Sequence, residues 1–245
     1  SIFSLVNGLL LRPLPGIQDA DRLVAVRSGR AGGALGVASY MDFLDFKERS
    51  RSFESLAAFK PRQVDASLTG ATESLGATMV TSSYFDVLKV RPHLGRYFSP
   101  DVDQGPGAHP ETVLTYGLWS RWFAGDPAVV GRDIVVNGQA YSVIGVTPRG
   151  FRGTSMFDVP DLFVPMTMQP NLMPDSGLLL DRRGWGGVSI VGRLAEGVSQ
   201  AAAATEIESI GQQLAIEYPS TNDSRRSAVV GFREAAMPGG ARGQI

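Results

Sequence analysis

The sequence predicts an α+β domain that carries a second, mostly β domain inserted between its two halves. The order of expected elements is strand, helix, strand at each end of the chain, with a mostly β region between them. Apolar residues make up 43% of the 245 residues, which is the usual share for a folded domain. A chain of this length can form one large domain or two small ones.

The first half of the outer domain is expected to open with a strand and a helix. Residues 23–27 alternate apolar and small side chains, as a short strand does. Residues 30–36 are rich in Gly and Ala and are expected to form a loop. Ser39 is expected to cap a helix, with Asp42 three residues on as a weaker form of the capping box.

Two strands and a short helix are expected next. Pro61 interrupts the pattern between 53–59 and 63–68, so two separate strands are predicted there. Residues 74–80 continue in strand style. Ser82–Ser83 is expected to cap a short helix that follows it.

The clearest local signal is a hairpin in the middle of the chain. Asn137–Gly138, between two apolar runs, is the pair that a type I′ turn needs. Residues 113–115 and 161–165 are expected to be strands. Residues 166–186 show no periodicity and are expected to form a long loop. One helix face is predicted at Leu118, Trp119, Trp122 and Phe123.

The last part of the chain returns to the strand, helix, strand order. Residues 187–194 and 227–233 are expected to be strands, and 199–218 is the best helix candidate. Pro219 stands just beyond its end. The expected buried stripe of this helix is Ala203, Ile207, Ile210 and Leu214.

Both ends of the chain have a distinctive composition. Residues 2–11 are apolar but are too few to cross a membrane, which takes about 20 residues. They are either a buried amphipathic helix or the last turns of a transmembrane helix. Residues 13–16 end that helix in either case, and residues 238–243 are expected to be a flexible exit.

Composition excludes several classes of protein. Lys plus Arg is 23 and Asp plus Glu is 24, so the basic excess of a nucleic-acid-binding protein is missing. Cysteine is absent, which excludes disulfide scaffolds, thiolate metal sites and cysteine nucleophiles. With only His93 and His109, a histidine-based triad or metal cage has almost no material, and both are expected to be solvated.

No motif specifies a catalytic or metal site. Asp101, Asp103, Gly105 and Gly107 resemble the opening of a calcium loop, but Gly105 stands where an oxygen ligand belongs. An exposed acidic turn is therefore favoured. The spacing of Gly29, Gly32, Gly33 and Gly36 does not match a phosphate-binding loop.

The remaining candidates favour structural roles. Trp119, Trp122 and Trp185 are expected to be core or interface anchors, since no basic patch accompanies them. Arg182–Arg183 is expected to be a solvated loop charge, with contact to an acidic partner or to lipid headgroups as the alternative. The 203–214 stripe is expected to pack in the core, with docking of a partner helix as the alternative.

Several segments together resemble a known family. The opening stretch 4–15 resembles the junction after the first transmembrane helix of MacB/FtsX-type ABC transporter permeases, closest to the branch with duplicated permease halves common in acidobacteria. Matches follow in the family's order at Ser39–Tyr40, 42–45, 51–54, Ser83–Leu88, Pro92, Gly95–Arg96, Phe98, Val113–Leu114, Leu118–Trp119, Trp122–Phe123, Val130–Gly131, Ile134, 136–138, Tyr141, 143–146, Arg193–Leu194, 197–199 and Ala203.

The resemblance implies a periplasmic core domain between the first and second transmembrane helices. It implies a porter-like subdomain formed by 16–70 and 187–245, a Sabre-like subdomain at 71–186, and the end of a transmembrane helix or stalk at 1–15. It implies no catalysis, cofactor or metal in this domain. No binding-site residue can be carried over, because the family has no shared cargo motif in this region.

The hypothesis is that the domain transmits ATPase-driven conformational change to periplasmic cargo or to a periplasmic partner. The implied partners are the cognate cytoplasmic ABC ATPase, acting through the permease membrane helices, a second permease subunit or half, and a periplasmic adaptor or cargo. The implied location is the extracytoplasmic face of the bacterial inner membrane. The alternatives are a free-standing secreted or periplasmic binding module and a hydrolase with an unrecognised site. Loops 30–36 and 166–186 are the expected docking regions.

Overall fold

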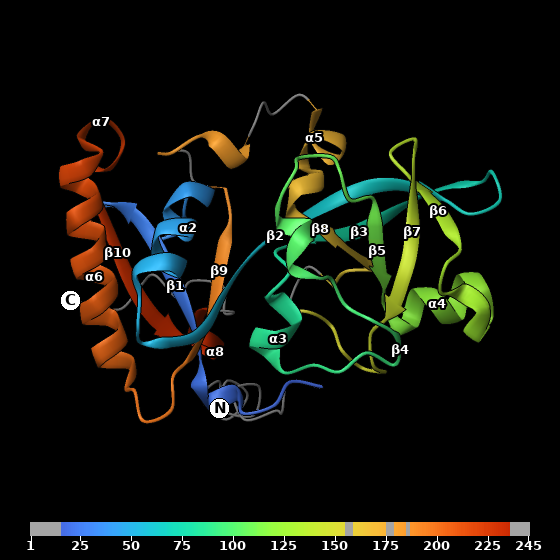
Figure 1. The fold of residues 1–245 in the computed structure, drawn as a ribbon, viewed down its shortest axis with the longest axis horizontal. Coiled ribbons are helices and arrows are strands. Elements are labelled where there is room, and N and C mark those ends of the chain that lie inside the picture. The colour runs from blue at the N-terminus through green and yellow to red at the C-terminus, as the bar shows by residue number, and fades with distance from the viewer. Residues whose placement is uncertain (1–15, 155–158, 175–178, 185–186, 236–245) are drawn as a thin grey trace, which may run out of the picture.

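A computed structural model describes residues 16–154, 159–174, 179–184 and 187–235, which form one ten-stranded sheet with helices against it (Figure 1). The order is β10-β1-β9-β2-β3-β8-β5-β7-β4, and β6 pairs with β2 and β7. The strands are β1 (Leu23–Arg30), β2 (Phe53–Ser67), β3 (Thr72–Val80), β4 (Leu94–Gly95), β5 (Glu111–Leu114), β6 (Asp133–Val136), β7 (Gln139–Val146), β8 (Leu162–Pro165), β9 (Ser189–Leu194) and β10 (Arg225–Gly231). The predicted α+β class is confirmed.

The helices divide between two lobes. The terminal lobe contains β1, β9 and β10 with α2 and α6, and the middle lobe contains β3 to β8 with α3, α4 and α5 (Figure 1). The helices and 3₁₀ turns are η1 (Ala20–Arg22), α2 (Tyr40–Arg49), α3 (Tyr84–Leu88), η2 (Pro100–Asp103), α4 (Tyr116–Phe123), η3 (Pro127–Val129), η4 (Met166–Met168), α5 (Gln169–Leu172), η6 (Leu179–Asp181), α6 (Gln200–Glu217), α7 (Pro219–Asn222) and α8 (Phe232–Ala235).

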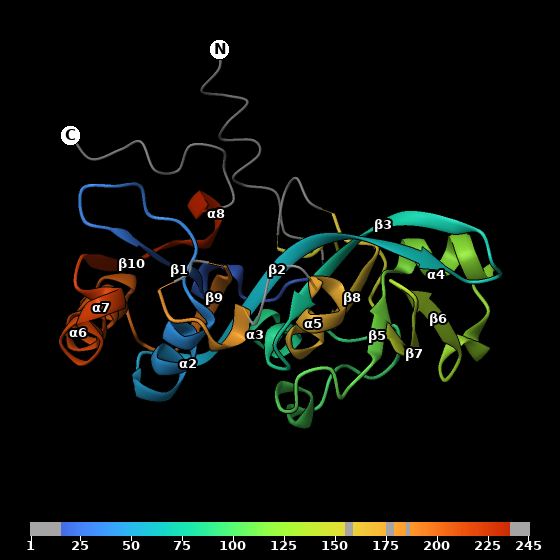
Figure 2. The ribbon, with the colours of Figure 1, turned by 90° about the horizontal axis from the view of Figure 1, so that it is seen from above.

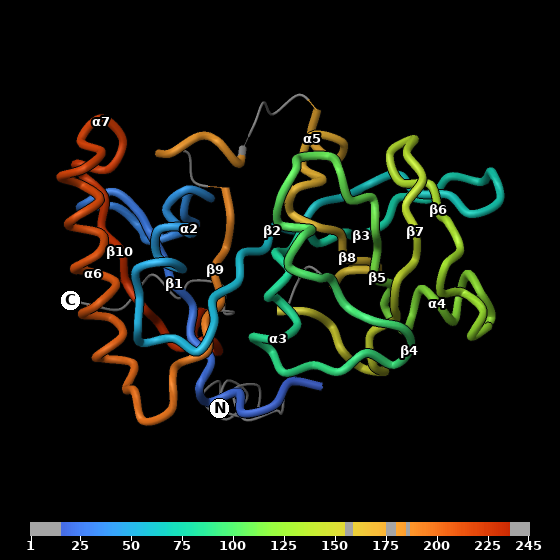
Figure 3. The backbone as a smooth tube through the Cα atoms, in the orientation of Figure 1, coloured from blue at the N-terminus to red at the C-terminus, as the bar shows by residue number. Residues whose placement is uncertain are grey.

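Strand β2 connects the two lobes. Its first part, from Phe53 to Phe59, pairs with β9, and from Phe59 onward it pairs with β3. Figure 3 follows this single path from one lobe to the other. The strand is continuous, so the prediction of two strands separated by Pro61 is wrong.

Pro61 fits inside β2 because its nitrogen faces an open side of the strand. The backbone nitrogen and carbonyl of Ala58 are hydrogen-bonded to Thr81, on the side of β2 that faces β3. The backbone nitrogen and carbonyl of Asp65 are hydrogen-bonded to Asn137, on the opposite side. The alternation between these residues places the Pro61 nitrogen on the same side as Asp65. On that side β9 has ended at Phe59 and β6 begins only at Ala66, so no ladder bond is lost.

Two hydrophobic clusters lie on opposite faces of the strands and each spans both lobes. Neighbouring residues alternate between them: Ile190 of β9 belongs to one and Val191 to the other, as do Leu162 and Phe163 of β8. Helices α2 and α6 cover the first cluster in the terminal lobe, and α8 lies on the opposite side (Figure 2). The two lobes therefore share their cores.

Local signals of the sequence account for the main helices and the hairpin. The side chains of Ser39 and Ser199 accept from Asp42 and Ala202 backbone nitrogens at the starts of α2 and α6. The predicted stripe of α6 is buried at Ala203, Ile207, Ile210 and Leu214. Asn137 and Gly138 have φ of 46° and 80°, as the hairpin turn requires.

Three local predictions are wrong. Ser83 precedes α3, but its hydroxyl donates to the Leu56 carbonyl and makes no cap bond. The expected loop 166–186 begins with η4 and α5, which bury Met166, Thr167, Met168, Gln169 and Leu172. The last strand ends at Gly231, and the chain turns into α8.

No helix within the described residues is long and apolar enough to cross a membrane. The predicted helix end at 1–15, Trp185 and the expected exit at 238–243 lie outside the described residues.

Candidate functional site

Most of the sequence-derived candidates have structural roles. Asp103 is hydrogen-bonded: it accepts from the Ser82 backbone nitrogen at 2.8 Å and hydroxyl at 2.7 Å. The prediction of an exposed acidic turn is therefore wrong for Asp103, whereas Asp101 is exposed. A hydrogen bond from the Ser99 side chain lowers the pKa of Asp101. Across the described ranges, no group of three or more His, Asp or Glu side chains could hold a metal ion.

The aromatic candidates anchor helix α4. Trp119 is buried and donates to the Asp126 carbonyl at 2.9 Å, and Trp122 donates to the Glu73 carboxylate of β3 at 2.9 Å. His93 is exposed, with its ring 5.2 Å from that of Tyr116. Both contacts agree with the prediction that these tryptophans are core or interface anchors: Trp119 is buried, and Trp122 is half-buried.

Arg183 corrects the prediction of a solvated loop charge. Its guanidinium lies 2.8 Å from Asp42 and 2.6 Å from Asp45, both on α2, and 3.8 Å from the centre of the Tyr218 ring. The Asp42 side chain is only 2% exposed and also accepts from Asn222 at 2.9 Å. Arg183 therefore fastens the return from the middle lobe onto the terminal lobe.

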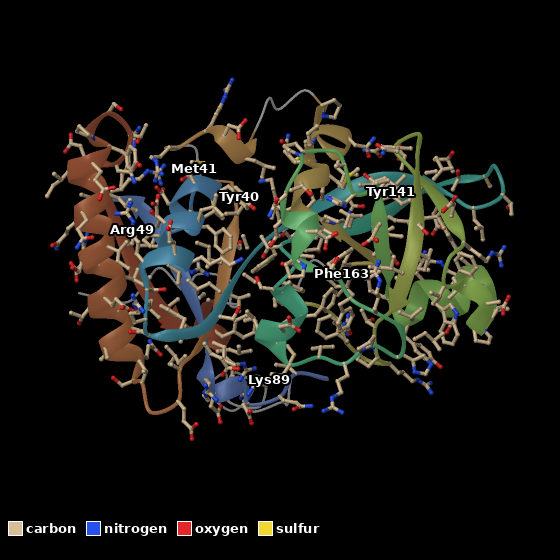
Figure 4. The ribbon with its side chains drawn as sticks, viewed as in Figure 1. Tyr40, Met41, Arg49, Lys89, Tyr141 and Phe163 are labelled. Carbon is tan, nitrogen blue, oxygen red and sulfur yellow. The ribbon has the colours of Figure 1, made fainter. Side chains whose placement is uncertain are left out.

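A second ion-pair cluster extends this contact along α2 and α6. Arg49 donates to Glu217 at 2.7 and 2.8 Å and to Asp45 at 2.9 Å (Figure 4). These bonds from Arg49 hold the pKa of Glu217 below its ordinary value. Loop 166–186, an expected docking region, is thus held in the body of the domain at both of its described ends.

The strongest candidate site is the fully buried Arg193 of β9, with 0% exposure. Its Nε donates to the Val87 carbonyl of α3 at 2.8 Å. Its Nη1 and Nη2 donate to the carbonyls of Asp19 and Gln18 at 3.0 and 2.7 Å. One side chain therefore joins a strand of the terminal lobe, a helix of the middle lobe and the leading segment, defined here as residues 16–22.

The chemistry of Arg193 suits this role. Burial lowers the pKa of its guanidinium, yet an arginine stays charged at neutral pH. The planar fork directs several donors to fixed acceptors, which one lysine ammonium cannot do with the same geometry. Each bond from a charged donor contributes about 1.5–3 kcal/mol. The connection between the three segments is therefore stiff.

Half-buried cations and exposed carboxylates close the outer side of the same junction. Arg22 of the leading segment donates to the Leu194 carbonyl at 3.1 Å and to Glu54 at 2.8 Å. Lys89, after α3, lies 3.5 Å from Asp19 and 3.9 Å from Glu54 (Figure 4). Together with Arg193 these side chains form the leading-segment junction.

Sequence reasoning did not single out Arg193 as a functional residue. Its signal was a lone cation in the apolar run Val188–Leu194, where an unpaired charge is costly. The acceptors could not be predicted, because they are backbone carbonyls up to 175 positions away. The carboxylate partners of Arg183 could not be predicted either, because Asp42 lies 141 positions away in the sequence.

The leading-segment junction and the two-lobed sheet together define the body of the domain. The chain belongs to the family of MacB-like periplasmic core domains, whose model matches residues 1–210. It is thus a MacB-like periplasmic domain of ABC transporter permeases, and this family is not a known catalytic domain. No curated protein is significantly similar in sequence.

Three solved structures share the fold. A domain of a putative permease protein from Porphyromonas gingivalis has a TM-score of 0.66 at 16% identity, covering 88% of this chain and 93% of that chain. The periplasmic region of MacB from Actinobacillus actinomycetemcomitans has a TM-score of 0.62 at 16% identity, covering 91% and 94%. The extracellular domain of the noncanonic ABC-type transporter YknZ from Gram-positive bacteria has 0.60 at 14%, covering 84% and 98%.

Proposed function

We propose that this domain transmits ATPase-driven movement of the permease membrane helices to cargo or to a partner outside the membrane. The observation that carries the proposal is Arg193, which ties the leading segment to β9 and to α3. A displacement of the leading segment then moves both lobes instead of bending one hinge. Catalysis belongs to a separate cytoplasmic ABC ATPase subunit or domain.

The body of the domain supports such a transmission. The sheet runs through β2 without a break, and both hydrophobic clusters contain residues of both lobes. Packed cores are close to crystalline in density and transmit displacement. Arg183 adds a second connection between the lobes, through Asp42 and Asp45. The domain therefore moves as a rigid body on its membrane helices.

The proposal also includes the subdomains of the chain, its partners and its location. Residues 16–70 and 187–245 form the porter-like subdomain, 71–186 the Sabre-like one, and 1–15 the end of a transmembrane helix or stalk. The partners are the cognate ATPase, reached through the membrane helices, a second permease subunit or half, and a periplasmic adaptor or cargo. The location is the extracytoplasmic face of the bacterial inner membrane.

Labelling of a single introduced cysteine tests this location. Ser120 is exposed on α4, and the chain has no cysteine of its own, so Ser120→Cys gives one site in the domain. In spheroplasts, a maleimide that does not cross membranes should label it in the membrane-bound, full-length protein. Labelling only after lysis would contradict the proposal. Release of the protein by osmotic shock would support the free-standing binding module instead.

A further inference from the structure

The edge of the molecule where the described chain begins carries cations that the junction does not use. A Cβ built on Gly16 would lie 3.5 Å from Pro148 Cγ and 3.7 Å from Phe151 Cβ. The backbone nitrogen of Gln18 donates to the Leu88 carbonyl at the end of α3. The turn after α3 and the loop 147–152 therefore flank the leading segment, along the lower edge in Figure 1.

Three arginines at this edge point to solvent. Arg91, Arg149 and Arg152 are exposed, and none of them makes an ion pair with any described residue. We call these three residues the basic rim. Lys89 is compensated by Asp19 and is not counted in it.

Contacts between the two loops hold the basic rim together. The backbone nitrogen of His93 donates to the Val146 carbonyl at 2.7 Å, which brings the Arg91 turn beside the Arg149 loop. The Arg149 guanidinium lies 5.8 Å from the centre of the half-buried Tyr116 ring. Tyrosine is enriched where a protein surface meets lipid headgroups.

Carboxylates at this edge reduce the positive charge without neutralising the basic rim. Asp21 of η1 and Asp86 of α3 are both exposed and make no ion pair within the described residues. Neither carboxylate lies on the two loops that carry the three arginines. The local excess therefore stays with the loops that flank Gly16.

We propose that the basic rim rests on the anionic phosphate headgroups of the membrane that anchors the domain. The inference rests on the proposed function, which places the apolar run 2–11 at the end of a membrane helix. Residues 11 and 16 are separated by five peptide units, which span at most about 18 Å. The basic rim thus lies within reach of the headgroups, and each Arg near an anionic surface contributes about a fivefold gain in binding.

The test is co-sedimentation of the whole chain with lipid vesicles, one set of pure phosphatidylcholine and one with about 30% phosphatidylglycerol. The variant is R91Q/R149Q/R152Q. Its matched control, R30Q/R62Q/R226Q, removes the same charge from exposed positions on other elements, β1, β2 and β10. Both variants keep the apolar run, so hydrophobic binding is common to all the proteins.

The expected result is a loss of binding to the anionic vesicles of about 100-fold in the rim variant and of less than about threefold in the control. Wild-type binding should also weaken between about 0.05 M and about 0.5 M salt. Equal losses in both variants, or wild-type binding that ignores salt, would overturn the inference. Saturation of the rim by inorganic phosphate alone would also overturn it. The assay contains no ATPase, so its failure leaves the test of movement transmission intact.

Discussion

Replacing Arg193 by Met removes the connection between the leading segment and the two lobes while keeping the volume of the side chain. Three hydrogen bonds, of 2.7 to 3.0 Å, are lost at the carbonyls of Gln18, Asp19 and Val87. At about 1.5 kcal/mol each, the loss is about 4–5 kcal/mol. Removing the buried guanidinium also removes its desolvation cost, of the order of a few kcal/mol. The net destabilisation expected is about 2–3 kcal/mol.

Urea unfolding followed by tryptophan fluorescence and circular dichroism measures this difference. The expected result is a lower midpoint with an unchanged slope, and a melting temperature reduced by roughly 5–10 °C. Arg193→Lys should be intermediate, because one ammonium cannot reach three separate acceptors with good geometry. Arg226→Met, at an exposed position of β10, is the matched control and should stay within about 0.5 kcal/mol of the wild type.

A free energy of unfolding for Arg193→Met within about 0.5 kcal/mol of the wild type would show that Arg193 does not hold the leading segment in place. Such a result would mean that water forms hydrogen bonds with the three carbonyls in the variant, or that other contacts hold the leading segment. A changed slope without a changed midpoint would point to the denatured state instead.

Three further changes test other parts of the structure. Arg183→Met leaves the buried Asp42 without its cation and should cost about 3–5 kcal/mol in urea unfolding; combining it with Asn at both carboxylate partners should recover part of this. Burial raises the pKa of Glu206, but bonds from Ser52 and Arg51 outweigh it and lower the pKa. Its stabilisation is present above the unfolded pKa and lost as pH falls through the folded value, so Glu206→Gln should flatten the acid limb of stability against pH. A Cβ at Gly145 would overlap a backbone carbonyl, so Gly145→Ala should abolish soluble expression, whereas Gly117→Ala, in open space on α4, should raise the melting temperature slightly.

The sequence predicted those parts of the fold that depend on short-range chemistry. Ser39 caps its helix, the stripe from Ala203 to Leu214 is buried, and Asn137–Gly138 turns the hairpin. Each of these rests on residues a few positions apart, for which spacing is sufficient evidence. The α+β class followed from the order of these elements.

Features that depend on distant partners could not be predicted. Pro61 fits inside β2 because no strand pairs with the side of β2 that its nitrogen faces: β9 pairs only as far as Phe59, and β6 begins to pair at Ala66. Residues 166–173 fold into short buried helices although they have no periodicity, because the middle lobe packs around them. The acceptors of Arg193 and Arg183 lie far away in the sequence, so the leading-segment junction was visible only in the structure.

Spin-label distances measure whether the domain carries movement of the membrane helices outward as a rigid body. The full-length permease, reconstituted in lipid with its ATPase, would carry Ser120→Cys alone or with Glu208→Cys on α6. Double electron–electron resonance would then be recorded without nucleotide and with a non-hydrolysable ATP analogue. For rigid-body movement, the distance between the Ser120 labels of two subunits should change while the Ser120–Glu208 distance within one subunit stays constant. Arg193→Met should weaken the change between subunits. An unchanged distance between subunits, or a change within one subunit as large as that between them, would contradict rigid-body transmission.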